Sequence, residues 1–225
     1  MNGILLIDKP KGWTSFDVVA KARGILKRGG INKPKVGHTG TLDPLATGLL
    51  VLLVGNYTKK ATELSKLDKT YEVEMKLGLT STTADEEGEK TPISDKKPTK
   101  NGIEEALHGF VGEIEQTPPI YSAIKVNGQR AYKLARAGKP VALEPRKVAI
   151  YFIRNTKYRY PYVSFETRVS SGTYIRSLVE DVGKKLGTGA YMSNLNRTEV
   201  GQFTINDAHQ IEDLTDEEIA KYLQK

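Results

Sequence analysis

The residue of this chain best placed for chemistry is Asp43, the one carboxylate in the segment 37–48. This segment reads Gly-His-Thr-Gly-Thr-Leu-Asp-Pro-Leu-Ala-Thr-Gly, and its glycines allow sharp backbone turns that residues with a Cβ resist. Apolar residues flank the acid, so the carboxylate is positioned to act on a ligand and not only to be solvated. An Asp-Pro pair is also an ordinary turn initiator, and the residues alone leave both interpretations open.

Two other side chains could take part in the same chemistry. Arg176 falls in the first turn of an expected helix, where the helix dipole disfavours a cation, so we expect it to have a specific partner. A guanidinium close to Asp43 would keep that carboxylate ionised, whereas the alternative partner is Glu180, one helical turn on. Tyr71 begins an alternating strand on its apolar face and, on burial statistics alone, is a core aromatic residue.

Composition excludes several classes of site. The chain has 225 residues, no cysteine and three widely separated histidines, which excludes disulfides, thiolate nucleophiles and clustered His or Cys metal sites. We therefore expect no metal and no cofactor. No apolar run is long enough to span a bilayer, and the first residues do not form a signal peptide, so we expect a cytoplasmic protein that is not inserted in a membrane.

Charge is unevenly distributed along the chain, whose formal net charge is +7. Residues 1–35 hold eight lysines and arginines against two acids, residues 125–200 hold fifteen against five, and residues 206–225 hold two against six. Separated basic blocks indicate an electropositive face for a polyanion, because neutralising phosphates releases counterions. Nucleic acid is therefore the favoured partner, with solubilising surface charge as the alternative.

Apolar periodicity predicts the elements that must position these residues. Continuous apolar runs or strict alternation predict strands over residues 3–7, 49–54, 71–77, 148–153 and 163–169. Apolar residues at helical spacing predict helices over residues 14–26, 59–66, 103–110, 175–186 and 216–225. We expect Phe16 on the buried face of the first helix, Thr173 and Gly187 as caps of the fourth, and an exposed loop over 80–98.

The order of these elements favours an α+β fold. Strands and helices mix without regular βαβ alternation, which predicts a mixed, mostly antiparallel sheet. The sequence has no internal repeat and no low-complexity linker. We expect one domain over residues 1–225, with residues 80–145 as a candidate inserted lobe.

Five segments, in order along nearly the whole chain, resemble the motifs of one enzyme family. Besides 37–48, they are residues 8–15 (Asp-Lys-Pro-Lys-Gly-Trp-Thr-Ser), 68–71 (Asp-Lys-Thr-Tyr), 117–125 with 131–136, and 171–178 (Ser-Gly-Thr-Tyr-Ile-Arg-Ser-Leu). The family is that of the B-type bacterial tRNA pseudouridine synthases, which isomerise uridine 55 in the TΨC loop of tRNA. The resemblance implies a pseudouridine synthase-like fold, with a large mixed sheet flanked by helices and loops around an RNA-binding cleft.

The resemblance also implies a reaction and its catalytic group. The C1′–N1 bond of the uridine breaks, the base turns, and C5 joins C1′. Asp43 would be the nucleophile, acting either at C1′, as carboxylates do beside the oxocarbenium-like centre of glycosidases, or by adding to C6 of the ring. The base is retained and rejoins the same sugar, so no cofactor or metal would be needed.

Other positions acquire roles from the same resemblance. Tyr71 would stack on the target uracil and offer its hydroxyl for proton transfer, and Arg176 would be the active-site arginine. A uridine in a folded loop must be extruded, and His38 would fill space among the displaced bases. The remaining positions implied at the base pocket or its wall are Tyr174, Leu195 and Lys9.

Two departures from the family pattern and two alternatives accompany this interpretation. Many relatives continue into a small C-terminal RNA-binding domain, which we do not expect here, and Asn196 stands where the family commonly has an arginine. A non-catalytic RNA-folding module is the alternative from another class, and the guide-RNA-dependent branch of the superfamily, which uses an extra C-terminal domain, is a further one. We expect a monomer acting on the TΨC arm of tRNA with no obligatory protein partner.

Overall fold

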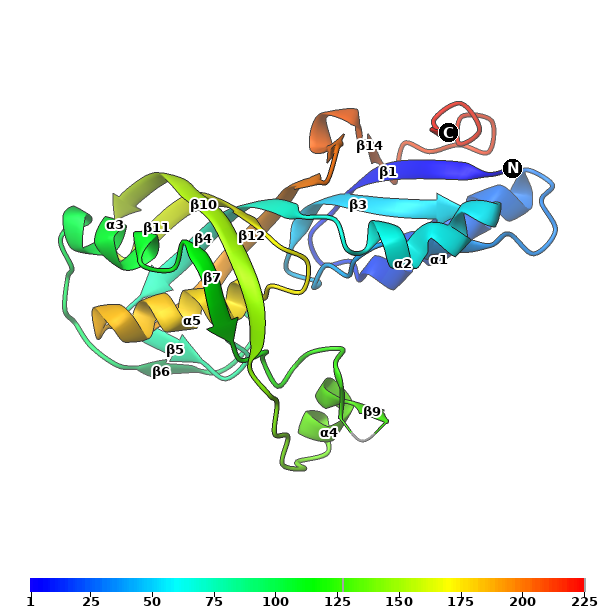
Figure 1. Ribbon diagram of the computed structural model, residues 1–225. Helices are drawn as coiled ribbons and strands as arrows, with labels where there is room; N and C mark the ends of the chain where they lie inside the picture. The colour runs from blue at the N-terminus through cyan, green and yellow to red at the C-terminus, as the bar shows by residue number, and fades with distance from the viewer. Residues whose placement is uncertain (127, 225) are drawn as a thin grey trace. The chain divides into compact units, whose positions relative to one another are not determined.

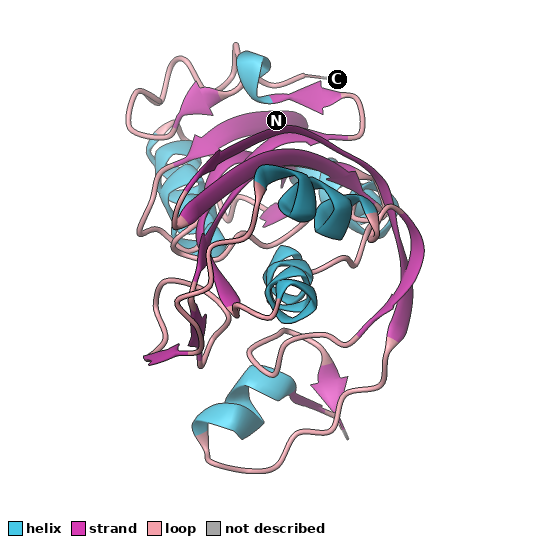
Figure 2. Ribbon diagram, turned by 90° about the vertical axis from the view of Figure 1, so that its left-hand side faces the viewer, coloured by secondary structure: helices cyan, strands magenta, loops and turns pink. Residues whose placement is uncertain are grey.

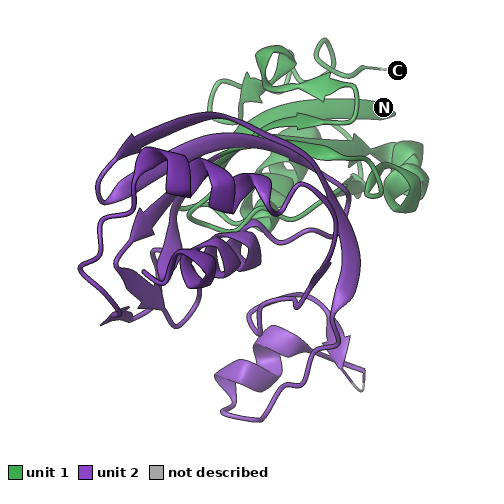
Figure 3. Ribbon diagram, turned by 60° about the vertical axis from the view of Figure 1, so that its left-hand side comes forward, with its two compact units in different colours: residues 1–72, 195–225 green, residues 73–194 purple. Residues whose placement is uncertain are grey.

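The computed structural model in Figure 1 describes residues 1–126 and 128–224, so Lys225 of the expected last helix lies outside it. The chain divides into two compact units, of which unit 1 comprises Met1–Glu72 with Leu195–Lys225 and unit 2 comprises Val73–Asn194 (Figure 3). The boundary falls inside two strands, β4 (Lys69–Leu77) and β12 (Ala190–Val200). The single domain with an inserted lobe over 80–145 stays a prediction.

Unit 1 is built on the apolar runs of the sequence. Its strands follow the order β14 (His209–Gln210), β1 (Gly3–Lys9), β3 (Thr47–Val54), β12 and β4, with β2 (Val36–His38) on β3 and β13 (Phe203–Thr204) on β12. The β1–β3 pair is antiparallel, with Leu5 opposite Leu52, whereas β1–β14 and β3–β12 are parallel. Both apolar runs are almost wholly buried, as expected for central strands covered on both faces.

The helices of unit 1 are α1 (Ser15–Arg28), the short 3₁₀ segments η1 (Gly55–Lys60) and η2 (Ile205–Asp207), and α2 (Ala61–Leu64). Thr14 caps α1 in a reciprocal capping box with Asp17. The expectation that Phe16 is buried is wrong, because 62% of it is exposed. The buried stripe is centred on Ala22, and at 3.6 residues per turn Phe16 lies about 120° away from it.

Two other expectations for unit 1 need correction. The helix expected over 59–66 is a 3₁₀ segment followed by a single α-helical turn. The helix expected over 216–225 is wrong, because the described tail forms turns instead. This tail buries Leu214 and Ile219 and ends beside β1, where the backbone of Gln224 exchanges two hydrogen bonds with Ile4, at 2.8 and 2.9 Å. Cross-strand pairing thus replaces the predicted helix, and it covers backbone groups at the edge of β1.

Unit 2 places two helices against one face of a curved sheet (Figure 2). Its strands follow the order β12, β4, β11 (Tyr162–Val169), β10 (Arg146–Arg159) and β7 (Gly112–Gln116). Inside the curve lie α3 (Lys100–His108) and α5 (Ile175–Leu186). The small elements are β5 (Leu79–Ser81) with β6 (Lys90–Pro92), and β8 (Lys125–Val126) with β9 (Gln129–Arg130) and α4 (Ala131–Arg136).

The predictions for the two ends of α5 and for the segment 80–98 were only partly correct. Gly187 ends α5 in the left-handed conformation, with φ of +68°, as predicted. Thr173 does not cap the other end: Tyr174 is the cap residue, and the Thr173 hydroxyl donates to the carbonyl of Ser170, at 2.9 Å. The first part of the exposed loop expected over 80–98 is instead the β5–β6 hairpin, which buries Asp85, whereas residues 93–98 form no helix or strand and are mostly exposed, as predicted.

The mixture of antiparallel pairs with two parallel ones, flanked by helices, confirms the predicted α+β class. The paired strands expected over 148–153 and 163–169 are the antiparallel pair β10–β11. Within the part of the chain that the structure describes, no helix is both long and apolar enough to cross a bilayer.

Gly48 lies in β3 where that strand pairs in parallel with β12, and a substitution at Gly48 tests how closely the two strands approach. Its φ is +99°, and a Cβ there would overlap the carbonyl oxygen of Arg197 and the side-chain oxygen of Asn196. We expect Gly48→Ala to lower the free energy of unfolding, measured in urea, by about 3 kcal/mol, the sum of left-handed strain and overlap. Gly187→Ala is the matched control, since its added Cβ meets no atom within 4 Å and only strain of about 1 kcal/mol is expected. Equal losses would contradict the close approach.

Candidate active site

Asp43 lies in the loop between β2 and β3 and is half-buried. Its neighbours Leu42 and Ala46 are buried, and the amide of Ala46 donates to the Asp43 carbonyl, at 3.0 Å, which closes a tight turn. The apolar residues anchor the loop in the core, whereas Asp43 as a residue stays partly exposed. The sequence pattern of one acid among apolar residues thus produces a presented carboxylate.

Hydrogen bonds fix the backbone on both sides of Asp43. Before it, the Ser15 hydroxyl accepts from the amide of Leu42, at 2.8 Å, and lies 3.1 Å from its carbonyl oxygen. After it, the carbonyl of Pro44 accepts from the amide of Gly12, at 2.8 Å, and from the Lys9 ammonium, at 3.4 Å. Because both flanking peptides are held by residues of β1 and α1 and by the turn between them, the backbone that carries Asp43 is fixed in one position.

Lys9 is a structural cation of this loop. It is fully buried, and its ammonium also donates to the carbonyls of Pro10 and Trp13, at 2.9 and 2.6 Å. Burial lowers the pKa of Lys9 to about 8, and the nearby Asp43 carboxylate opposes this shift. These contacts hold the loop around Asp43, and the predicted place of Lys9 at the wall of the base pocket stays a prediction.

Arg197 joins the loop to the sheet and to Tyr71. Only 1% of Arg197 is exposed, and its guanidinium donates to the carbonyls of Leu49, at 2.8 Å, and Gly40, at 3.1 Å. Burial lowers the pKa of Arg197, while a hydrogen bond with the Tyr71 side chain opposes the shift. The buried Tyr71 is therefore held by a cation as well as by packing. Arg197 was not among the predicted site residues, because its neighbours Asn196, Thr198 and Glu199 make it resemble a surface residue in sequence.

His38 ends β2 close to the same guanidinium. Burial and the charge of Arg197 lower the pKa of His38, and a backbone hydrogen bond at Gly40 opposes the shift only in part. The imidazole is therefore neutral at pH 7, the form that can stack on a base while accepting a hydrogen bond.

The position that departs from the family pattern has partners of its own. The Asn196 side chain accepts from the hydroxyl of Thr47, at 3.2 Å, and donates to the carboxylate of Glu72, at 2.9 Å. These bonds connect β12 to the start of β3 and to β4. Leu195, the preceding residue, is buried on β12.

In unit 2, Arg176 is buried at the start of α5 and forms an ion pair with Asp85, at 3.5 Å. Its guanidinium also donates to the carbonyls of Thr83, at 3.2 Å, and Tyr121, at 2.9 Å. Asp85 was missed from the sequence because it lies in an acidic run that resembles a solvated loop. Asp43 belongs to unit 1, so its predicted pairing with Arg176 stays a prediction.

Tyr174 precedes α5 and is fixed by one side chain of β7. The Gln116 amide accepts from the Tyr174 backbone N–H, at 2.7 Å, and donates to its carbonyl, at 3.0 Å. These two hydrogen bonds to the backbone of Tyr174 take the place of the side-chain cap that α5 lacks. It sets the start of the helix and, with it, the position of Arg176.

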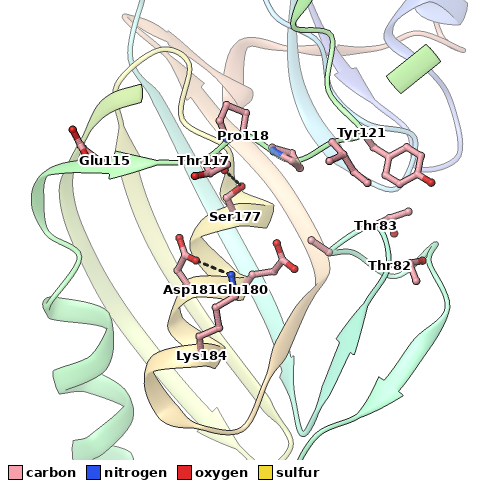
Figure 4. Close-up of a pocket in the computed structure, with 13 residues that line it drawn as sticks. Thr82, Thr83, Glu115, Thr117, Pro118, Tyr121, Ser177, Glu180, Asp181 and Lys184 are labelled. Carbon is pink, nitrogen blue, oxygen red and sulfur yellow. Dashed lines mark hydrogen bonds and ion pairs between the residues drawn. The ribbon is translucent and has the colours of Figure 1, made fainter. Parts of the chain in front are cut away.

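A pocket of about 500 Å³ lies beside α5 in unit 2 (Figure 4). Its walls are the turn 82–84, the segment 117–121 and the α5 residues Ser177, Glu180, Asp181 and Lys184. Arg176 ties both walls together through the carbonyls of Thr83 and Tyr121. The acids on its lining, of which Glu180 has a pKa raised by burial, make this pocket a poor phosphate site.

The structure thus places Lys9, His38 and Tyr71 near one buried guanidinium in unit 1, with Asp43 close to Lys9, and Tyr174 with Arg176 on one helix start in unit 2. A presented carboxylate, a hydrogen-bonded phenol and a neutral imidazole can supply nucleophilic, proton-transfer and stacking functions. Among the described residues, no group of three or more histidines and acids could hold a metal ion.

Comparisons with known proteins converge on one family. The family model described as TruB family pseudouridylate synthase (N terminal domain) matches residues 27–175, and that of the tRNA pseudouridylate synthase B C-terminal domain matches residues 176–225. The tRNA pseudouridine synthase B of Clostridium kluyveri is 48% identical over 223 residues, which cover 99% of this chain and 75% of that protein. The synthase of the same name from Chlorobaculum tepidum is 45% identical and covers 95% and 89%, respectively.

Solved structures show the same fold. A chain of a Cbf5–Nop10–Gar1 complex superposes with a TM-score of 0.76 at 30% identity, over 99% of this chain and 59% of that one. An H/ACA RNP bound to a substrate RNA containing 2′-deoxyuridine gives a TM-score of 0.70 at 29% identity, over 95% and 52%. This chain therefore spans slightly more than half of those structural relatives.

Removing the acid of the buried Arg176–Asp85 ion pair tests how much this pair contributes to stability. Asp85→Asn leaves the buried Arg176 without its carboxylate, and we expect a loss of about 3 kcal/mol in the free energy of unfolding, measured in urea. The control is Asp181→Asn, which removes the partner of Lys184 from an exposed pair and should cost below about 0.5 kcal/mol. A small effect at both positions would show that Arg176 is satisfied without Asp85.

The buried lysines predict a pH dependence. Lys69 donates to the carbonyls of Ser65 and Leu67, at 2.7 and 2.5 Å, and burial with the charge of Arg197 lowers its pKa to about 8, as burial does for Lys9. The unfolded chain keeps these protons up to about pH 10, so between about pH 8 and 10 it binds more protons than the folded chain, and stability should rise with pH.

Nitrogen NMR of the lysine ammonium groups, with urea unfolding at both ends of this range, measures the effect. Lys66→Gln, at an exposed lysine, should leave the pH dependence unchanged, whereas Lys9→Gln with Lys69→Gln should flatten it. Two buried lysines that titrate near pH 10 would refute the prediction.

Proposed function

The chain belongs to the TruB family of pseudouridylate synthases, as its motifs indicated, and we propose that it isomerises uridine to pseudouridine at position 55 of the TΨC arm of tRNA. The single observation that best supports this is Asp43, a half-exposed carboxylate with both flanking peptides fixed by hydrogen bonds. A reaction that must hold a detached base beside its sugar needs such a fixed group.

The reaction rearranges one nucleotide. The C1′–N1 bond breaks and the C5–C1′ bond forms, C5 loses its proton, and N1 gains one. The change conserves all atoms and needs no oxidant or reductant. Asp43 acts as the nucleophile at C1′ or at C6, and both pathways use the same presented carboxylate.

Two residues near the buried guanidinium are proposed to position the base. Tyr71 stacks on the target uracil, and its bond to Arg197 fixes the direction of its hydroxyl, which is available for proton transfer. His38, which is neutral at pH 7, fills space among the bases displaced when the uridine is extruded. The other proposed residues are Tyr174 and Leu195 at the base pocket, Lys9 at its wall, and Arg176 as the active-site arginine that pairs with Asp43.

The proposed partner is tRNA itself. The basic blocks at residues 1–35 and 125–200 supply cations for its phosphates. We propose that the chain acts as a monomer in the cytoplasm, without an obligatory protein partner.

Asp43→Asn is the decisive variant. It keeps the size and most hydrogen bonds of the side chain but removes the nucleophile, so we expect no detectable pseudouridine in unmodified tRNA, with tRNA affinity within about threefold of the original, because a lost charge at one position changes binding little. Pseudouridine is detected chemically, by carbodiimide labelling and primer extension. Asp95→Asn, at an exposed acid, is the control and should be fully active.

A tRNA with cytidine at position 55 tests the site of modification. The unaltered chain should form pseudouridine at position 55 of ordinary tRNA and none in the cytidine-55 tRNA. An unaltered chain that binds tRNA but forms no product would favour the RNA-folding module instead. Activity that requires an added guide RNA would favour the guide-dependent branch.

A further inference from the structure

The outer face of the β10–β11 pair in unit 2 gathers rings and cations that the proposed reaction does not use. We call it the basic–aromatic face and define it by Tyr151, Phe152, Arg154, Lys157, Tyr162 and Arg168. Inside the curve of the sheet lie α3 and α5 (Figure 2). The side chains of the basic–aromatic face are exposed, except that of Phe152, which is half-buried.

Strand register shows why these side chains point outward. On β11, Val163, Phe165 and Thr167 are buried, so the alternate residues Tyr162 and Arg168 face away from the helices. Opposite them on β10, Phe152 pairs with Arg168 and Arg159 pairs with Tyr162. The arrangement follows from the period of two and is fixed by the buried inner face.

A β-bulge adds one more ring to this face. Ile150 pairs with Val169 and Phe152 with Arg168, so Tyr151 is the extra residue of β10. Tyr151 is 49% exposed, and Tyr162 is 41% exposed. Both rings are therefore available to a partner that approaches this side of the sheet.

The charge of this face is positive. Its acid on β11 is Glu166, which already pairs with Arg154, at 2.6 Å, and accepts from Asn155, at 2.8 Å. The acid on the neighbouring strand, Glu74, accepts from the hydroxyl of Ser193, at 2.8 Å. The cations Lys157 and Arg168 are exposed on this face, and the exposed acids Glu113 and Glu115 follow on β7 at its edge. The positive charge is therefore concentrated over β10 and β11, where a polyanion is the complementary partner.

Each ring of the face has a cation beside it. The guanidinium of Arg168 lies 5.9 Å from the centre of the Tyr151 ring, that of Arg154 lies 4.3 Å from Phe152, and the Lys76 ammonium lies 5.6 Å from Tyr162. Both aromatic rings and guanidinium planes stack on nucleic-acid bases, and the same cations reach phosphates. Tyr151 and Phe152 lie at one end of the strand pair and Tyr162 at the other, six β11 residues away, so the rings are placed to contact separate nucleotides of one strand.

We propose that the basic–aromatic face binds single-stranded RNA. Unpaired bases offer their faces to Tyr151 and Tyr162, whereas the bases of a duplex are already stacked on each other and an acidic protein would use the cations alone. The face lies on the side of the sheet opposite α5, which bears Arg176, so it is separate from the base pocket proposed on that helix. It gives the chain a hold on unpaired RNA in addition to the nucleotide that is modified.

Oligoadenylate of about 12 nucleotides is the probe, a length within the site sizes of single-strand binding surfaces. It contains no uridine and cannot be a substrate, so its binding is measured independently of the proposed catalytic function. Fluorescence anisotropy gives the dissociation constant of the full chain over a range of salt concentrations. Circular dichroism and thermal unfolding confirm that each variant is folded.

Three double variants separate rings from charges. Tyr151→Ala with Tyr162→Ala removes both rings and should weaken binding at least about fivefold, whereas Tyr151→Phe with Tyr162→Phe keeps the rings and should bind like the original. Lys157→Gln with Arg168→Gln should weaken binding and make the salt slope shallower by about 1.4, since each phosphate contact on a single strand contributes about 0.7. Lys66→Gln with Lys100→Gln removes two exposed cations outside the face and should not change the slope.

The outcomes divide clearly. Loss of binding in the alanine variant with retention in the phenylalanine variant supports the proposal. Unchanged binding in the alanine variant overturns it, and if only the charge variant then weakens, the surface recognises polyanions such as duplex RNA or acidic proteins. If tRNA is modified normally while oligoadenylate fails to bind, this proposal fails and the proposed function stands.

Discussion

The fully buried guanidinium of Arg197 is the constraint on which the candidate site depends. A charge excluded from water must be satisfied by protein groups, and its donors reach the carbonyls of Leu49 and Gly40 and the side chain of Tyr71. These partners come from β3, the glycine-rich loop and β4, so a single side chain fixes three segments that are distant in sequence. Any movement of the loop would leave part of this charge without a partner, and that cost holds the loop in one conformation.

Cations bound to carbonyls recur through the molecule, and they explain how a loop can be rigid without regular secondary structure. Lys9 fixes the peptides around Asp43, and Arg176 fixes both walls of the pocket beside α5. Carbonyls satisfied by buried cations need no strand partner, so these segments can turn sharply. A reaction that detaches a base and joins it to the same sugar benefits from such preorganised surroundings, because a flexible site open to water would let the detached base escape.

The two faces of the sheet in unit 2 show how one strand pair serves two purposes. The inner residues of β11 bury against α3 and α5 and set the register, and that register in turn directs every other side chain outward. Rings and cations on the outer side contribute little to the core, which leaves their identity open to selection for binding.

The sequence by itself determined the family, the α+β class and the elements whose apolar periodicity is strong, such as β1, β3, β4 and α5, because burial of a continuous or alternating pattern is a local property. It also predicted Asp43 as the catalytic residue, from the glycines and apolar neighbours of its loop, and that role stays a prediction. Only the tertiary structure decided which charged side chains are buried: Asp85 and Arg197 resemble surface residues in sequence, and each becomes internal because distant segments surround it. The tail over 216–224 was mispredicted for the same reason, since pairing with β1 and burial of Leu214 and Ile219 outweighed its helical pattern.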